Sequence, residues 1–313
     1  MPKMNNLDEL RAVFFISVLL FHLFPKIFPY GYLGVDLFFV LSGFLMQSIM
    51  RTRLSLRQKL LFFRNRVFRI FLPKIFSIFV VVPFSVLLFP PDILENFGQS
   101  MVAASLGLEN IFFYLTTNYW AAAGIEKPLL HFWSLGVEIQ FYILFTVLCL
   151  FNFNTIIIWV TLSICGLLFN YIYIDDESFN FYMLSGRLYL FCMGIAAADD
   201  RLHVKIAGLC LTFFCLMIQD FTTAFFIAAV TLGIFGFQYE GWPRSTLKFI
   251  GKRSYSYYIA HWLVISVFWI LTQTKIDIYS AIILVLVIGV YGELSYRLTE
   301  LWMYRTVFRK STL

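Results

Sequence analysis

Seven ionisable residues lie inside long apolar stretches of this 313-residue sequence, and they are the first candidates for chemistry. They are His22, Asp36, Lys74, Glu138, Arg187, His261 and Glu293. A charged side chain inside a bilayer costs roughly 2.5–3.5 kcal/mol on insertion scales, so it needs a partner or a wet cavity. Each is therefore a candidate functional group, to be weighed against a purely structural role.

His22 follows Arg11 by eleven positions in the first apolar segment. In a helix this spacing is a rise of about 16 Å, which would put Arg11 at the cytoplasmic surface and His22 halfway across the bilayer or further. An imidazole at that depth can accept and release a proton near neutral pH, as a general base must. The alternative is a hydrogen bond that only holds helices together.

Asp36 and Arg187 open two further apolar segments. A short connection separates Asp36 from the first segment, so it should lie near the outer end of the first helix. It could orient an imidazole there, or it could cap the second helix. Arg187 could pair with Glu138, bind an oxygen of an acceptor, or extend to the membrane interface.

The stretch 131–142 carries a polar stripe. His131, Ser134 and Glu138 share one helical face, and Tyr142 follows one turn later. A polar stripe on a lipid-buried helix must face a cavity or other helices. We expect Ser134, Glu138 and Tyr142 to line a cavity, with an interhelical polar clamp as the alternative.

A basic segment, 51–69, contains seven Lys and Arg residues and no acid. The positive charge of this segment would be explained by retention on the inside of the membrane and by contact with anionic lipid. Arg66 and Arg69 also share a helical face, and a guanidinium can bind two phosphate oxygens at once. His261 should lie about four residues into a span from this same side.

The composition requires lipid as a solvent. Hydrophobic residues make up 60% of the chain and charged residues 13%, against about half and a quarter in soluble domains. The net charge of +6 is explained by cytoplasmic loops, so nucleic-acid binding is not expected. We predict an all-α polytopic membrane protein.

Ten spans are expected, because a spanning helix needs about 20 mostly apolar residues. They are 12–29, 33–50, 70–89, 132–151, 155–174, 182–198, 204–219, 221–238, 255–272 and 278–297. If the stretch 97–118 does not cross and both termini are cytoplasmic, 19 Lys and Arg lie inside and four outside, with Lys74 left out. If it crosses, the split becomes 12 against 11, so the first arrangement is favoured. Segment 90–131 is then an outer segment with one surface or re-entrant helix.

The polar residues thus fall into two sets. A cationic set faces the cytoplasm and consists of Arg11, Arg66, Arg69 and His261. A mixed acid and base set lies deeper and outward and consists of His22, Asp36, Glu138 and Arg187. This division suits transfer of a group from a phosphate-bearing cytosolic donor to an acceptor hydroxyl on the far side. A transporter or flippase is the main alternative, although we find no inverted repeat. A third is an inactive scaffold or sensor.

At these residues the sequence resembles the bacterial membrane acyltransferase family usually called acyltransferase 3, over about Asn6 to Arg305. Arg11 and His22 look like its Arg-x10-His motif, and 34–44 is similar to its second-helix signature. Arg66 and Arg69 resemble Arg-x-x-Arg, and 132–142 resembles Trp-Ser-Leu-x-x-Glu-x-Gln-Phe. Segments 185–194 and 254–261, and then Glu300, follow in the family's order. The departures are Gly136 in the glutamate block, the absence of a Pro after His261, and Leu-Trp after Glu300.

The resemblance implies a bacterial inner-membrane enzyme that transfers an acyl group, usually acetyl, from cytosolic acetyl-CoA to an extracytoplasmic glycan. Arg11 and His22 would be essential, and Arg66 and Arg69 would serve the donor. His22 would act as general base or as an acyl carrier, Glu138 or Asp36 would orient its ring or the acceptor, and Arg187, Ser134 and Tyr142 would bind the acceptor. We expect one transmembrane domain over 1–313, with no fused soluble domain and no metal.

Overall fold

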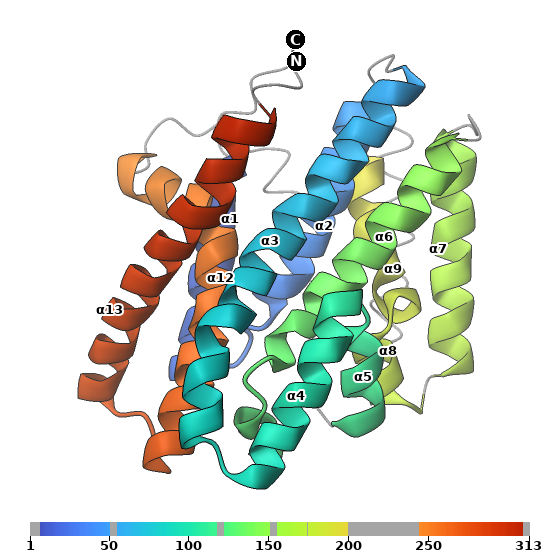
Figure 1. Ribbon diagram of the computed structural model, residues 1–313. Coiled ribbons are helices and arrows are strands. Elements are labelled where there is room, and N and C mark those ends of the chain that lie inside the picture. Colours follow the sequence, from blue (N-terminus) through green and yellow to red (C-terminus); the bar gives the residue numbers. More distant parts are fainter. Residues whose placement is uncertain are drawn as a thin grey trace. The chain divides into compact units, whose positions relative to one another are not determined.

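The computed structural model describes residues 7–50, 55–117, 122–150, 155–173, 175–199 and 244–308. Every regular element in these ranges is a helix, which confirms the expected all-α class (Figure 1). The expected spans 204–219 and 221–238 lie outside the described residues. The helices form two units, which are described separately: unit 1 comprises 1–60 and 140–252, and unit 2 comprises 61–139 and 253–313.

Unit 1 contains α1 (Leu7–Leu23), α2 (Leu33–Met50), α7 (Thr155–Ile172), α8 (Glu177–Tyr182) and α9 (Leu184–Ala197). It also holds the second part of α6 (Trp133–Leu150). The first predicted span, 12–29, ends six residues early. Pro25 follows the last turn of α1, and a proline disfavours helical backbone in the residue before it.

Helices α2 and α9 are the most intimately packed pair in unit 1. A Cβ on Gly194 would lie 1.9 Å from the carbonyl oxygen of Val40, and one on Gly43 would lie 2.1 Å from that of Phe191. Each helix thus offers a glycine to the backbone of the other, as small residues do where membrane helices approach closely. The two backbones are fixed against each other beside Asp36 and Arg187.

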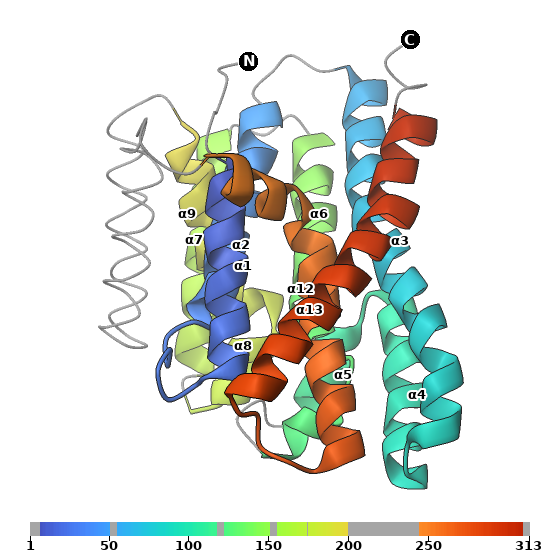
Figure 2. The same ribbon diagram turned by 90° about the vertical axis from the view of Figure 1, so that its left-hand side faces the viewer.

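Unit 2 begins in α3 (Leu56–Leu88), continues through α4 (Pro91–Leu106), α5 (Glu109–Thr116) and the 3₁₀ turns Ala122–Glu126 and Leu130–Phe132, and ends in the first part of α6. It resumes in α12 (Arg244–Thr272) and α13 (Ile278–Ser295). Two π-helical segments follow, Tyr296–Leu301 and Tyr304–Phe308. Helix α4 returns alongside the end of α3 (Figures 1 and 2).

The outer segment differs from its prediction. One helix was expected in 90–131, but α4 and α5 are separate because Gly107 adopts a left-handed φ of 73°. The N–H of Gly107 donates to the carbonyl of Ala104, and the N–H of Leu108 donates to the carbonyl of Ala103. These two bonds close α4 with a Schellman-type cap. The chain then restarts at Glu109, so this glycine determines where that acid lies.

Helix α3 starts well before the predicted span 70–89. Ser55 and Gln58 form a capping box, in which the Ser55 N–H donates to Gln58 Oε1 (2.9 Å) and the Gln58 N–H donates to Ser55 Oγ (3.3 Å). The basic residues from Arg57 to Arg69 are therefore helical and continuous with the apolar part.

By length and composition, four helical stretches in the described part of the chain can cross a membrane: Leu56–Leu88, Leu130–Leu150, Ser245–Thr272 and Ile278–Thr306. Three shorter apolar helices, Leu33–Ile49, Ile157–Ile172 and Leu184–Ala197, match further predicted spans. The chain is a multi-pass membrane protein. The number of ten spans and the cytoplasmic placement of both termini stay predictions.

Candidate active site

The pair formed by Arg11 and His22 lies on α1, as the spacing predicted. Arg11 is near the start of the helix, where Nη1 lies 3.4 Å from the Asp8 carboxylate. His22 is half-buried in the last turn, with its ring 5.0 Å from that of Phe21. Eleven residues of helix separate them by about 16 Å, so one rigid element presents a cation at one end and an imidazole at the other.

Asp36 and Arg187 form a buried ion pair in unit 1. Nη1 of Arg187 donates to Oδ1 of Asp36 at 3.1 Å. The pair lies between α2 and α9, beside the glycine contacts described above. Arg187 therefore pairs with Asp36, whereas the sequence had offered Glu138, an acceptor oxygen or the membrane interface. Asp36 lies inside the first turn of α2, which begins at Leu33, and not at its cap position.

The backbone around Arg187 holds its guanidinium in place. Nε donates to the carbonyl of Phe181 at 3.1 Å, and the guanidinium carbon lies 4.7 Å from the centre of the Phe181 ring. Only glycine fits at position 186, because a Cβ there would lie 2.2 Å from the carbonyl oxygen of Asn180. The tight turn between α8 and α9 thus aims Arg187 at α2.

A buried cluster of hydroxyl and imidazole groups lies in unit 2. Ser134 Oγ and the Tyr258 hydroxyl are 2.8 Å apart, and Tyr258 also donates to the His131 carbonyl at 3.1 Å. The rings of His131 and His261 are 5.4 Å apart. His131 belongs to a 3₁₀ turn rather than to α6, yet it lies with Ser134 as the stripe predicted.

The other two members of the predicted stripe differ in surroundings. Glu138 is half-buried in the part of α6 that belongs to unit 2. Tyr142 belongs to unit 1, where its hydroxyl donates to Ser42 Oγ at 3.3 Å. The stripe thus continues into both units along α6.

The surroundings of His261 differ from those expected. Helix α12 begins at Arg244, seventeen residues before His261, rather than at 255. Beyond His261, Trp262 Nε1 donates to the carbonyl of Lys127 at 3.0 Å, and Ser266 bonds to the carbonyl of Ile125. His261 therefore lies with His131 and beside the segment that precedes α6. The loop residue Lys127 has its pKa lowered by burial.

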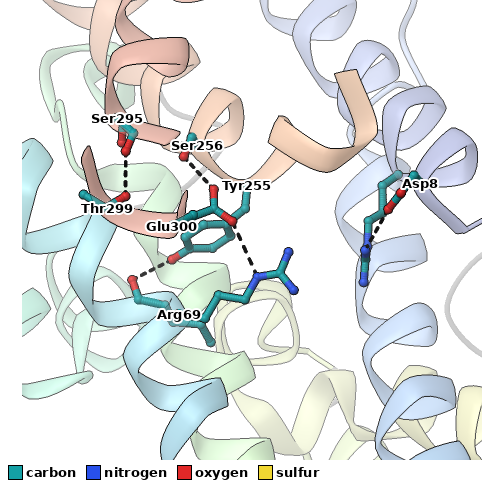
Figure 3. A network of polar contacts seen from close by, with 9 residues as sticks. Asp8, Arg69, Tyr255, Ser256, Ser295, Thr299 and Glu300 are labelled. Atoms are coloured by element: carbon teal, nitrogen blue, oxygen red, sulfur yellow. Dashed lines mark hydrogen bonds and ion pairs between the residues drawn. The ribbon is translucent and has the colours of Figure 1, made fainter. Parts of the chain in front are cut away.

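Arg66 and Arg69 lie one turn apart on α3 in unit 2. The guanidinium of Arg66 is 5.5 Å from the centre of the Phe62 ring. Nε of Arg69 lies 3.6 Å from a carboxylate oxygen of Glu300, whose other oxygen accepts from Ser256 Oγ at 2.6 Å (Figure 3). Glu300 was part of a motif in the sequence, but no role for it was predicted.

A second acid that the sequence missed is Glu109. Its carboxylate lies 2.8 Å from Nζ of Lys74, and both side chains are fully buried. The unusual Gly136 lies against this pair, since a Cβ there would be 2.8 Å from Asn110 Oδ1 and 3.3 Å from Glu109 Cδ. Lys74 stood out as a charge in an apolar span, whereas the position of Glu109 depended on the break at Gly107.

Comparison with known proteins shows the family of the chain. Residues 4–292 match the acyltransferase domain family called acyltransferase 3, and the chain belongs to it. The all-helical, apolar fold is thus that of a membrane acyltransferase of this family.

The chain is similar to two curated relatives in particular. It is 27% identical to the peptidoglycan O-acetyltransferase OatA of Listeria monocytogenes, over 94% of this chain and 55% of that protein. It is 30% identical to the O-acetyltransferase OatA of Staphylococcus aureus, over 94% of this chain and 56% of that protein. The chain thus spans a little over half the length of these relatives. No solved structure matches it.

Proposed function

We propose that this protein transfers an acetyl group from acetyl-CoA to a hydroxyl of a cell-wall glycan. Membership of the acyltransferase family and similarity to two O-acetyltransferases support the reaction class. The structural observation that carries the proposal is the arrangement along α12. Ser256 contacts the cluster that holds Arg69, and His261 lies with His131, five residues or about 7.5 Å further on.

The donor would be held by arginines. In unit 2, Arg66 and Arg69 on α3 suit the phosphates of a coenzyme A. In unit 1, Arg11 on α1 would help to hold the coenzyme A arm or would stabilise negative charge. The enzyme would lie in the inner membrane of a bacterium, with the donor-binding arginines toward the cytosol.

The transfer itself needs a base. His22 would take the proton from the acceptor hydroxyl while that oxygen attacks the thioester carbonyl carbon. The carbon–sulfur bond then breaks, and the leaving thiolate takes the proton back from the imidazolium. In a variant of this scheme His22 carries the acetyl group first. General base catalysis contributes roughly 10²–10⁴-fold, and positioning of the two substrates would supply much of the rest.

The acceptor would be held by the remaining groups. In unit 2, Glu138, Ser134 and the buried His131–His261 cluster offer an acid, a hydroxyl and imidazoles that suit sugar hydroxyls. In unit 1, Tyr142 and the Asp36–Arg187 pair offer a hydroxyl and a fixed guanidinium that suit them as well. The contact of His261 with His131 supports assigning His261 to this set rather than to the donor, and the bond between Asp36 and Arg187 supports a role of Asp36 in orienting that arginine.

The test measures incorporation of radiolabel from acetyl-CoA into cell-wall glycan, in membranes that contain the wild-type protein or His22→Ala. We expect label with the wild type and a loss of roughly 10²-fold or more with the variant. Equilibrium binding of CoA should be unchanged in the variant, which separates chemistry from donor binding. Equal labelling by both proteins would exclude His22 as the base, and no labelling by either would exclude this donor and acceptor.

A further inference from the structure

The Arg69 guanidinium is held at one edge only. Nε lies 3.6 Å from Glu300, and the side chain is 32% exposed. Within the described part of the chain, no group is bonded to its two terminal nitrogens. Figure 3 shows these nitrogens directed away from Glu300. The donor fork of the guanidinium is therefore oriented and still available to a ligand.

Glu300 itself is fixed from several sides. It is buried, and its second oxygen accepts from Ser256 Oγ on α12 at 2.6 Å. It belongs to the π-helix Tyr296–Leu301, whose wider turn accommodates one residue more than an α-helical turn. One extra residue rotates the following side chains by about 100° relative to an α-helix, so the π turn sets the direction of Glu300.

The π turn has its own support. Thr299 Oγ1 donates to the carbonyl of Ser295 at 2.7 Å, and both residues are buried (Figure 3). A threonine that bonds back to the carbonyl four residues earlier is a known cause of irregularity in helices. The Thr299 bond therefore favours the departure from α-helical geometry in the turn that contains Glu300.

The backbone beside Arg69 is also fixed. Pro73 has no N–H to donate to the carbonyl of Arg69, four residues earlier. The next carbonyl, that of Ile70, accepts from the Tyr255 hydroxyl at 2.7 Å. Residues 255 and 256 of α12 thus fasten both the backbone and, through Glu300, the side chain of this position.

We propose that Glu300 is the positioning residue that aims the terminal nitrogens of Arg69 at a phosphate of the acyl donor. Glu300 offsets part of the positive charge of Arg69. We therefore expect Glu300 to favour phosphate binding by orienting the guanidinium and not by adding to its charge. An arginine that is not held loses rotamer freedom when it binds, and the planar fork binds two phosphate oxygens only in one orientation. This inference deepens the proposed function and rests on it for the identity of the donor.

The experiment compares Glu300→Gln with the wild type in the purified full chain. We expect the Kd for CoA and the KM for acetyl-CoA to rise about ten-fold to a hundred-fold, as happens in metal sites when a residue that orients a ligand side chain is removed, with kcat within about three-fold. Glu293→Gln is the matched control. Glu293 joins α13 to α12 through Arg253, as Glu300 does through Ser256, but it does not contact Arg69. Its Kd and KM should stay at the wild-type values.

A cycle with Arg69→Lys shows whether Glu300 acts through the arginine. The effect of Glu300→Gln on the Kd for CoA should disappear in the Arg69→Lys background, because there is then no guanidinium to orient. Ser256→Ala should weaken CoA binding less, by about five-fold, since it removes one hydrogen bond and leaves the ion pair.

The outcomes are distinct for the two proposals. A Glu300→Gln protein with unchanged Kd and KM, or with effects that add fully to those of Arg69→Lys, overturns the positioning role. If the wild type binds CoA more tightly than Glu300→Gln but transfers no acetyl group, the positioning role stands and the proposed function fails.

Discussion

The Arg187 guanidinium lies 3.1 Å from the carboxylate of Asp36, although 151 positions separate the two residues. Both side chains are buried, so removing either partner leaves a charge without its counter-ion. We expect Asp36→Asn to lower the free energy of unfolding by about 3–5 kcal/mol. Thermal unfolding in detergent would measure this.

The double variant Asp36→Asn/Arg187→Gln is the control for that experiment. Because it removes both charges, its loss of stability should be smaller than the sum of the two single losses. Additive losses would mean that the two residues act independently, contrary to the observed pair.

A second buried ion pair, Lys74–Glu109, leads to a different prediction. It joins the short helix α5 to α3, whereas Asp36–Arg187 joins α2 to α9. Lys74→Met should destabilise the protein by about 3–5 kcal/mol, because it leaves the Glu109 carboxylate buried alone. Lys74→Met/Glu109→Leu should recover most of this loss. Limited proteolysis within 107–117 reports on the attachment of α5, and equal cleavage of the single and double variants would contradict the idea.

The contact between α2 and α9 predicts an effect of adding one methyl group. Gly194→Ala places a Cβ 1.9 Å from the Val40 carbonyl oxygen, so the two helices must separate. We expect a loss of about 1–3 kcal/mol. Gly289→Ala in α13 is the control, because a Cβ there meets nothing within 4 Å. It should be neutral or stabilising by up to about 1 kcal/mol, since alanine favours helix. Equal unfolding temperatures for the two variants would refute the close approach.

The N-terminus of α13 carries a pH-dependent prediction. Hydrogen bonds from the side chain and backbone of Ser280 lower the pKa of Asp277 below its ordinary value. A lowered pKa in the folded state means that the cap stabilises the helix above the unfolded pKa of about 3.9, and that this stabilisation is lost as the pH falls through the folded pKa.

Hydrogen exchange in the first turn of α13 would test this. Protection should be lower in Asp277→Ala than in the wild type at neutral pH, and the difference should vanish in strong acid. Asp277→Asn keeps a capping oxygen that does not titrate, so its protection relative to Asp277→Ala should persist at low pH. If the difference in protection between the wild type and Asp277→Ala did not change with pH, the titrating cap would be contradicted.

Much of the helical framework could be predicted from hydropathy, because lipid requires about 20 apolar residues per crossing. The expected spans 33–50, 132–151 and 278–297 nearly coincide with α2, α6 and α13. Hydropathy says nothing of polar extensions, and this explains the errors at α3 and α12. The capping box at Ser55 extends α3 into the basic segment, and α12 begins at Arg244, before the predicted span 255–272.

The pairing of charges could be predicted less well. The sequence identified Asp36, Lys74 and Arg187 as costly residues that need partners. It could not identify the partners, since these depend on local backbone events: the left-handed Gly107 sets Glu109, and the turn at Gly186 aims Arg187 at Asp36. The π turn before Glu300 has no comparable signature in the residue pattern. The roles of the predicted catalytic and binding residues stay predictions.

Helix α12 carries Ser256 and His261 within less than two turns, and its next turn is bonded to the loop carbonyls of Ile125 and Lys127. A straight helix over that interval behaves as a rigid rod. A rotation of α12 about its own axis would therefore displace the Glu300 cluster and the histidine cluster together and in a fixed ratio.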